Sequence, residues 1–274
     1  MKRGEYIMIK QPNKCELKYA KEMSKKAISP VISAVMLTSV LLVILMISTF
    51  VANNILELRV QSTEFEQAKT NMLLLDEIIS EAGVKYGSGS YVQFNLRSGA
   101  LNIVRGDDKI KVFINNSVEP IVEFQTLSIV YRAGDLVFSS PANLKGSKVL
   151  IAEGAAASLG YIRIESESPV QIKLDYNRIR VVEVGTAVVN GTERNILQIV
   201  FFQLESGSIG GSGIIRIKAQ NGGIFIETLE YSSHIVKISV QLGSYLEEYT
   251  FVGKEACPTV ITIIKSLVEV SVSA

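Results

Sequence analysis

The sequence predicts an α+β protein in which a long N-terminal helix, first transmembrane and then amphipathic, precedes an antiparallel β-sandwich domain. Three observations lead to this prediction. No charged side chain occurs between Lys26 and Glu57. Apolar residues at helical spacing then continue to Ala82, and from Tyr91 onward apolar residues alternate with a period of two. With 274 residues and 47% hydrophobic content, the chain is long enough to bury a large core.

Basic residues are concentrated in front of the uncharged run. Residues 1–27 carry eight Lys or Arg against three Glu, a net charge of +5, whereas the whole chain has a net charge of +1. Basic residues before an apolar helix hold that end in the cytoplasm, so the rest of the chain is expected outside. Because the positive charge is this local, we interpret it as a topology signal and expect no nucleic-acid partner.

The uncharged run predicts a helix that crosses a membrane. About 20 apolar helical residues are enough to span a bilayer, and residues 28–56 exceed that length. We expect one helix over 28–82, with Ser29 as its cap, Pro30 in its first turn and Gly83 at its end. The run is too long for a cleaved secretory signal, and Phe50 stands where a cleavage site after Ala52 would need a small side chain.

The second half of the predicted helix carries an apolar seam. Its members recur at spacings of three and four with only Ser62 polar among them: Ile55, Leu58, Phe65, Ala68, Met72, Leu75, Ile79 and Ala82. Charged residues are expected on the other faces, at Glu57, Arg59, Glu64, Glu66, Lys69, Asp76, Glu77 and Glu81. The seam is expected to pack on the chain's own β-domain, on neighbouring subunits, or on both.

The residues around the start of this helix resemble a known processing signal. Lys25-Lys26-Ala27-Ile28-Ser29-Pro30-Val31-Ile32 is similar to the class III signal sequence of archaeal type IV pilins and archaellins. The resemblance implies a membrane precursor that a prepilin peptidase cleaves between Ala27 and Ile28. It also implies a sandwich domain behind the helix, self-assembly through the helices, and a secretion ATPase and a membrane platform as partners. Met1, Met8 and Met23 are alternative starts, and Met23 would give a compact leader.

The remainder of the chain reads as a strand-rich exterior domain. We expect a flexible joint at 83–90 and a domain at 91–274, built as one sandwich in preference to two. Three turns are predicted to close hairpins: Gly106-Asp107-Asp108, Asn190-Gly191 and Asn221-Gly222. Alternating apolar residues predict further strands at 170–176 and 268–272.

The exterior domain offers little that indicates chemistry. Asn115 and Asn190 begin acceptor triplets for N-linked sugar. His234 is the sole histidine and no nucleophile elbow accompanies it, while Cys15 and Cys257 lie on opposite sides of the predicted membrane segment. The glycine-rich stretch 206–213 lacks the Lys-Ser/Thr and the helix of a phosphate loop. We therefore expect no enzyme activity, no metal and no cofactor.

Two functional interpretations follow from the sequence. The first is a pilin-like structural subunit of a surface filament, which leaves the membrane after processing and acts in adhesion. The second is a single-pass anchored protein that displays an exterior binding domain, or a minor pilin that caps a filament. The sequence does not separate major from minor pilin, and it does not identify what the exterior domain binds.

Overall fold

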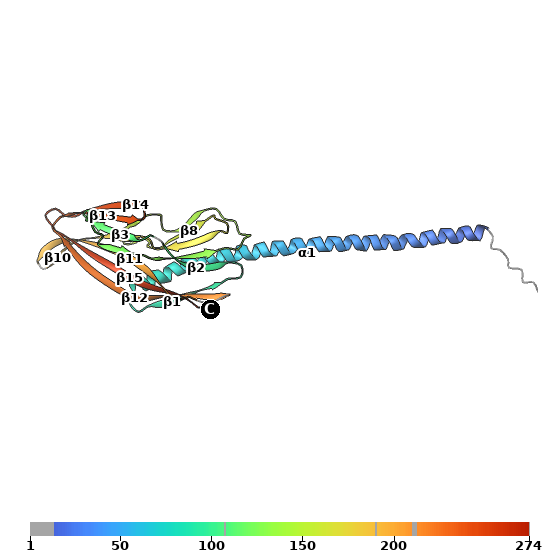
Figure 1. Cartoon of the computed structure of the whole chain (residues 1–274), viewed down its shortest axis with the longest axis horizontal. Helices are drawn as coiled ribbons and strands as arrows, with labels where there is room; N and C mark the ends of the chain where they lie inside the picture. The colour runs from blue at the N-terminus through green and yellow to red at the C-terminus, as the bar shows by residue number, and fades with distance from the viewer. Residues whose placement is uncertain (1–13, 107, 190, 210–212, 274) are drawn as a thin grey trace, which may run out of the picture. The chain divides into compact units, whose positions relative to one another are not determined.

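The computed structural model describes residues 14–106, 108–189, 191–209 and 213–273, with side chains from Pro30 on, apart from those of residues 208 and 209. The chain divides into two compact units, residues 1–57 and 58–274. One helix, α1 (Lys14–Val84), supplies most of the first unit and opens the second, and strands follow it (Figure 1). The predicted α+β class, with an N-terminal helix before a strand-rich domain, is confirmed.

Helix α1 extends beyond both predicted ends. It begins at Lys14 instead of residue 28, so Pro30 lies inside the helix and not in its first turn. Residues 14–27 consist largely of Lys, Glu, Leu, Met and Ala, which favour helix. The helix therefore continues on both sides of Pro30, although proline has no backbone N–H and one helical hydrogen bond is missing there. At the other end α1 passes Gly83 and stops at Val84, and Gly87 adopts a φ of 71° in the following turn. The joint is correspondingly shorter than predicted.

The strands form three sheets in the described part of the chain. Sheet A has the order β1 (Gly89–Asn95), β12 (Ile214–Tyr231), β15 (Thr259–Ser273), β11 (Thr192–Ile209), β10 (Ile179–Val189), β7 (Ile151–Glu153). Sheet B has the order β2 (Ala100–Arg105), β5 (Leu127–Arg132), β9 (Gln171–Asp175), β8 (Tyr161–Glu165), β6 (Ala142–Lys145). Sheet C has the order β14 (Tyr245–Val252), β13 (Ile235–Leu242), β3 (Ile110–Ile114), β4 (Val122–Phe124).

The expectation of a purely antiparallel domain is wrong for sheet A. Sheets B and C are antiparallel, but β15 runs parallel to β11 and β10 runs parallel to β7. The cause is the position of β15, which lies between β11 and β12 and pairs with both. These two neighbours run in opposite directions, so β15 has to be parallel to one of them. Of the glycine-rich stretch at 206–213, residues 206–209 belong to β11, where Ser206 and Ile209 pair with Val270 and Val272 of β15.

The structure confirms one of the three predicted hairpins and contradicts the other two. The β10–β11 hairpin is confirmed, with Val189 paired to Thr192, although Asn190 itself lies outside the described residues. The hairpin around Gly106 is wrong: β2 pairs with β5 in sheet B, while β3 pairs with β13 and β4 in sheet C. The hairpin at Asn221-Gly222 is also wrong, because β12 continues through it with a shift of register.

Two hydrophobic clusters bury opposite faces of sheet A. Neighbouring residues of a strand point to opposite faces, and β11 alternates between the clusters. Its even-numbered residues Val200, Phe202 and Leu204 join the first cluster, and its odd-numbered residues Leu197, Ile199 and Phe201 join the second. The first cluster contains the seam of α1 together with sheets A and B, and the second contains sheets A and C. A single antiparallel sandwich is therefore not confirmed.

Candidate functional site: an apolar helix segment and its anchorage

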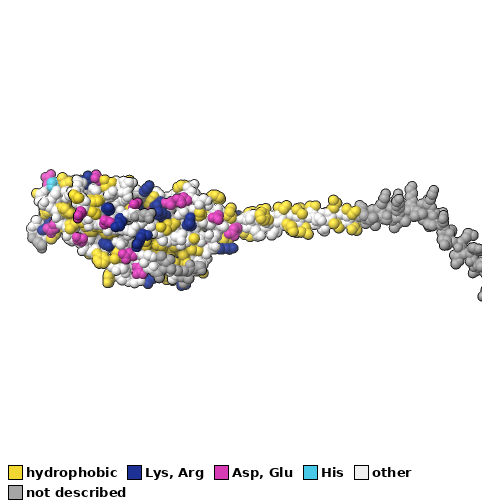
Figure 2. Space-filling view, in the orientation of Figure 1, with side chains coloured by type: hydrophobic (Ala, Val, Ile, Leu, Met, Phe, Trp, Pro, Cys, Tyr) yellow, Lys and Arg dark blue, Asp and Glu magenta, His cyan; other side chains and the backbone are white. Residues whose placement is uncertain are grey.

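The segment of α1 from Pro30 to Leu56 exposes apolar side chains in every direction. Every residue in it is exposed, including Met46 at 67% and Phe50 at 68%. In the view of Figure 2 its surface is apolar or uncharged, with no basic or acidic side chain. By length and composition it is able to cross a membrane. Water is an unfavourable surrounding for such a surface, so lipid or other apolar helices are expected around it.

Hydroxyl groups inside the apolar segment hydrogen-bond to the helix itself. Thr38 Oγ1 donates to the carbonyl oxygen of Val35 at 3.0 Å, and Ser39 Oγ donates to the same oxygen at 2.8 Å. Thr49 Oγ1 donates to the carbonyl oxygen of Leu45 at 2.8 Å. Polar groups in lipid have to find partners within the protein, and these three do so within one turn.

The residues of the expected processing site belong to α1, but their side chains lie outside the described part of the chain. Lys25, Lys26, Ala27, Ile28 and Ser29 all have helical backbone in the uncleaved chain. Their order along the chain is as the sequence analysis stated, and nothing further about their surroundings follows.

The predicted seam is confirmed from Phe65 onward. Its six members from Phe65 to Ala82 are each no more than 3% exposed and all belong to the first hydrophobic cluster. Ile55 and Leu58 are 51% and 49% exposed, so the seam begins later than predicted. Between Phe65 and Ala82 the partner of the seam is the chain's own β-domain. The opposite side of this helix segment is exposed, including Leu74 at 45%.

Glu64 fastens the first buried turn of α1 to the β1–β2 connection. Its carboxylate accepts hydrogen bonds from the backbone N–H groups of Arg97, Ser98 and Gly99 at 3.2, 3.0 and 2.9 Å. Burial alone would raise the pKa of Glu64, but these three N–H donors outweigh it and hold the pKa below its usual value. Burial and the neighbouring Glu64 charge raise the pKa of Tyr131, whose hydroxyl donates to the same carboxylate.

Asp76 is a fully buried carboxylate at the middle of the seam. The hydroxyl of Tyr176 on the β9–β10 connection donates to Asp76 Oδ1 at 2.5 Å, and Lys145 Nζ lies 2.5 Å from Oδ2. Burial raises the pKa of Tyr176, and the charge of Asp76 adds to that effect. Gly160 packs so closely that a Cβ atom there would overlap Asp76 Oδ1. A buried charge is tolerated where it is paired and hydrogen-bonded in this way.

Three amide side chains extend this anchorage along the helix. Gln61 Oε1 accepts the N–H of Leu136 at 3.0 Å, and Asn71 Nδ2 donates to the carbonyl oxygen of Gln93 at 3.0 Å. At the end of the helix, Asn221 Nδ2 donates to the carbonyl oxygen of Ala82 at 2.7 Å. The tethers are distributed from Gln61 to Ala82, so the second unit holds its helix along the whole segment.

The sequence analysis placed Glu64 and Asp76 on exposed faces, and this is wrong. Glu64 is 8% exposed and Asp76 is 0% exposed. Helical spacing could have predicted their burial, because residues four apart lie on the same face of a helix. Glu64 lies four residues before Ala68 and Asp76 lies four residues after Met72, so both are on the buried stripe. The partners of these residues come from distant strands and connections, and helical spacing alone carries no information about them.

The remaining predicted site residues lie apart from the helix anchorage. Asn115 is exposed in the turn after β3 with a φ of 51°, and its side-chain oxygen accepts the N–H of Lys237 at 3.0 Å. Asn190 lies outside the described residues. His234 is partly exposed, and Cys257 is buried as a free thiol. Among the described residues, no three His, Cys, Asp or Glu side chains gather as metal ligands would.

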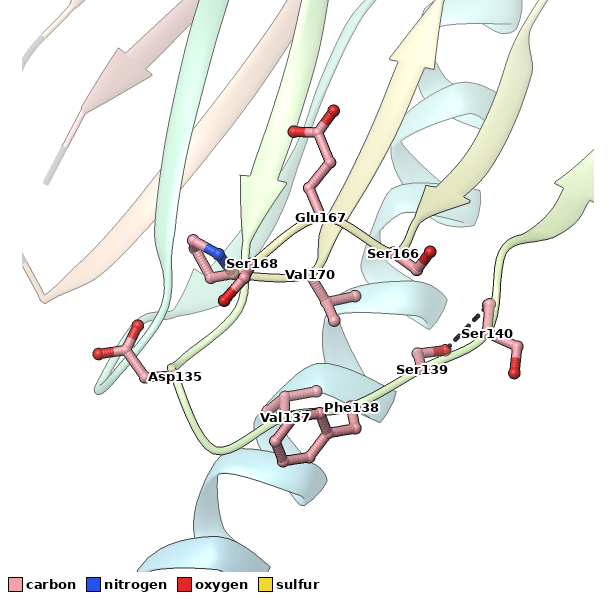
Figure 3. Close-up of a pocket in the computed structure, with 10 residues that line it drawn as sticks. Asp135, Val137, Phe138, Ser139, Ser140, Ser166, Glu167, Ser168 and Val170 are labelled. Carbon is pink, nitrogen blue, oxygen red and sulfur yellow. Dashed lines mark hydrogen bonds between the residues drawn. The ribbon is translucent and has the colours of Figure 1, made fainter.

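An open pocket of about 510 Å³ lies between two connections of sheet B. One wall is the β5–β6 loop, with Val137 and Phe138, and the other is the β8–β9 turn at 166–170 (Figure 3). Serine hydroxyls and the carboxylates of Asp135 and Glu167 line it together with these apolar side chains. The mixture of groups indicates no particular reaction.

No family model, curated protein sequence or solved structure matches this chain. The features that indicate its function are the exposed apolar segment of α1 and the domain that buries the rest of this helix.

Proposed function

We propose that this protein is a pilin-like structural subunit of an archaeal type IV pilus-type surface filament. The observation that supports this most is the division of one helix into two parts. From Pro30 to Leu56 its apolar side chains are exposed on all sides, and from Phe65 to Ala82 they are buried in a β-rich domain. A subunit that packs through its helix and presents a folded domain to water requires this division.

In this proposal, the precursor enters the membrane with its basic N-terminus in the cytoplasm, and a prepilin peptidase cuts between Ala27 and Ile28. Cleavage removes Lys25 and Lys26, which would otherwise bring unpaired charge into a bundle of apolar helices. The remaining helix exchanges lipid neighbours for copies of itself, with a secretion ATPase and a membrane platform assisting. The strand-rich domain, as an exterior sandwich, supplies adhesion.

A filament also explains why the exposed helix segment has no partner in its own chain. Subunits related by an operation that does not close on itself form helical assemblies, in which every copy supplies the surface that covers its neighbour. The hydroxyl groups of Thr38, Ser39 and Thr49 donate to their own helix, so this exchange of neighbours leaves none of these three donors unpaired.

The second candidate is an anchored exterior binding protein, or a minor pilin that caps a filament. The same internal hydrogen bonds favour it, because an uncharged segment in which Thr38, Ser39 and Thr49 donate to their own helix is also stable as a permanent membrane span. The two candidates differ in where the mature chain is found. Shearing of cells followed by sedimentation of the released filaments separates them. Abundance in the pellet supports the structural subunit, and retention with membranes supports the anchor.

A substitution tests the role of the apolar segment in assembly. Ile32→Lys places a charge at the fifth residue after the expected cleavage point, where the side chain is 53% exposed. Processing should continue, but filament yield should fall below detection because the bundle would have to bury the charge. Ile32→Leu is the matched control and should assemble. Wild-type filament yield from Ile32→Lys would contradict the proposal.

A further inference from the structure

The β5–β6 loop, residues 133–141, presents apolar side chains to the outside although it is firmly held. Phe138 is 88% exposed and Leu136 is 41% exposed, while Val137 between them is 6% exposed and belongs to the first hydrophobic cluster. Figure 3 shows Val137 and Phe138 adjacent in this loop, with the helix behind them. The loop therefore has two residues in the core, Ala133 and Val137, whereas Leu136 and Phe138 contribute nothing to that core.

Hydrogen bonds to α1 and to the β8–β9 turn fix this loop in place. The N–H of Leu136 donates to Gln61 Oε1 at 3.0 Å, and the N–H of Ala133 donates to the carbonyl oxygen of Val170 at 2.8 Å. Gly134 packs against the Gln61 side chain so closely that a Cβ atom there would overlap Oε1. Phe138 is thus exposed in a loop whose position is fixed by these contacts.

The helix residue that holds the loop lies just after the apolar segment. Gln61 is five residues beyond Leu56, the last residue of that segment, which corresponds to about 7.5 Å along a helix at roughly 1.5 Å per residue. The headgroup layer of a bilayer is about 5–8 Å thick on each side of the hydrocarbon core. If residues before Glu57 span the membrane, the turn of α1 that contacts the loop lies at the depth of the headgroups.

We propose that the β5–β6 loop is a lipid-contact element, with Phe138 and Leu136 entering the headgroup region of the membrane that α1 crosses. This inference rests on the membrane-spanning role of α1 in the proposed function. The loop then gives the strand-rich domain a point of attachment to lipid in addition to the helix.

The surroundings of Phe138 favour lipid over a second copy of the chain. The pocket beside the ring is lined by hydroxyls from residues 139, 140, 166 and 168 and by the carboxylates of Asp135 and Glu167. A single aromatic ring among polar groups suits the membrane interface, where the ring meets acyl chains and the polar groups meet headgroups and water. Arg59, Arg97 and Arg132, which are near the tethered residues in sequence, are exposed and suit lipid phosphate groups.

The test uses a fluorescent reporter in the full chain. The sequence has no tryptophan, so Phe138→Trp introduces a single one at a position exposed enough to accept it. The matched control is Tyr86→Trp, at a residue that is 82% exposed and lies just past the end of α1. Val84 is 23 residues beyond Gln61, or about 35 Å along the helix, so the control reporter is far from the headgroups. Both variants are placed in vesicles of phosphatidylcholine and phosphatidylglycerol, with and without lipids brominated near the glycerol backbone.

We expect the emission of Phe138→Trp to shift to the blue relative to Tyr86→Trp, and brominated lipid to quench the first variant and leave the second unchanged. Flotation with the vesicles distinguishes the membrane role of α1 from the lipid contact of the loop. If both variants float but neither is quenched, the loop inference is wrong and the membrane role of α1 stands. If neither variant floats, the membrane role of α1 fails and the inference fails with it. A blue shift that occurs in sheared filaments, with no quenching by lipid, would show that the loop contacts another copy, which also overturns the inference.

Discussion

The two halves of α1 differ in how their apolar residues are distributed and in their surroundings. Between Pro30 and Leu56 apolar residues occupy all faces and all are exposed; between Phe65 and Ala82 six of them form one buried stripe, while Leu73 and Leu74 remain exposed. The second half is also fixed by polar groups, through Glu64 and Asp76 among others. The comparison shows that a helix with apolar residues on all faces needs an external partner, whereas a helix with one apolar stripe can be covered by its own chain.

The largest effect should come from placing the same charge in each half. Leu75→Asp buries an unpaired carboxylate in the first cluster, where Leu75 is 0% exposed, and should cost more than about 4 kcal/mol, enough to unfold the domain. Leu45→Asp changes a residue that is 65% exposed and should leave the thermal unfolding of the domain unchanged while weakening membrane insertion. Circular dichroism and flotation measure both. Equal thermal stability of the two variants would contradict the division of the helix.

A smaller effect tests the packing around the buried carboxylate of Asp76. Gly160→Ala places a methyl group against Asp76 Oδ1 and should lower the free energy of unfolding by about 3 kcal/mol. Gly106→Ala is the matched control, because its nearest neighbours would be 3.9 Å from the new Cβ atom. Urea denaturation measures both variants. If Gly160→Ala is as stable as the control, the Asp76 site is looser than the distances indicate.

Glu64 should contribute stability that depends on pH. The pKa of Glu64 in the folded chain is below its ordinary value of 4.5, so the folded state binds this proton less readily than the unfolded state. The contribution is therefore complete above about pH 4.5 and is lost as the pH falls through the lowered pKa. Glu64→Gln should cost about 2 kcal/mol at neutral pH and remove this part of the acid dependence.

The control for Glu64 is another glutamate of the same helix. Glu66 lies on the exposed side and pairs with Lys69 at 2.6 Å, so Glu66→Gln should change stability by less than about 0.5 kcal/mol. Urea denaturation at several pH values compares the two variants. An unchanged acid dependence in Glu64→Gln would show that the three backbone N–H groups do not favour its charged form.

The smallest expected effect compares two neighbouring leucines. Leu74 is 45% exposed and Leu75 is fully buried. Leu74→Ala should change the unfolding free energy by less than about 0.5 kcal/mol, and Leu75→Ala should reduce it by about 2–5 kcal/mol. If Leu74→Ala alters filament yield and leaves stability intact, the exposed side of this helix segment contacts a neighbouring subunit. A large loss of stability in Leu74→Ala would instead show that the helix is turned differently in the domain.

Helical periodicity predicted the seam residues of α1 well, because burial of a helix face is visible in spacings of three and four. Alternation also predicted β9 and the end of β15. The order of the strands was beyond this kind of reasoning. The insertion of β15 between β11 and β12 depends on pairing between residues far apart in sequence, such as Asn195 with Thr259. Local turn signals led to error at Asn221-Gly222, where a shift of register replaces the predicted hairpin.

The anchorage of the helix shows the same limit. We expected Glu64 and Asp76 on exposed faces because they are charged, although their helical spacing is compatible with the buried stripe. The two carboxylates can be buried because the backbone N–H groups of residues 97–99 and the hydroxyl of Tyr176 donate to them. These donors are far from the helix in sequence, so helical spacing does not predict them. The loop with Phe138 had no sequence signal, because its position follows from a contact with Gln61 across 75 residues of chain.

The most direct test of the central claim is the N-terminal residue of the mature protein, measured by mass spectrometry on material isolated from the cell surface. The account predicts Ile28, with the basic leader removed and the whole apolar segment retained. A mature chain that begins after Phe50, or one that still carries Lys25 and Lys26, would contradict it.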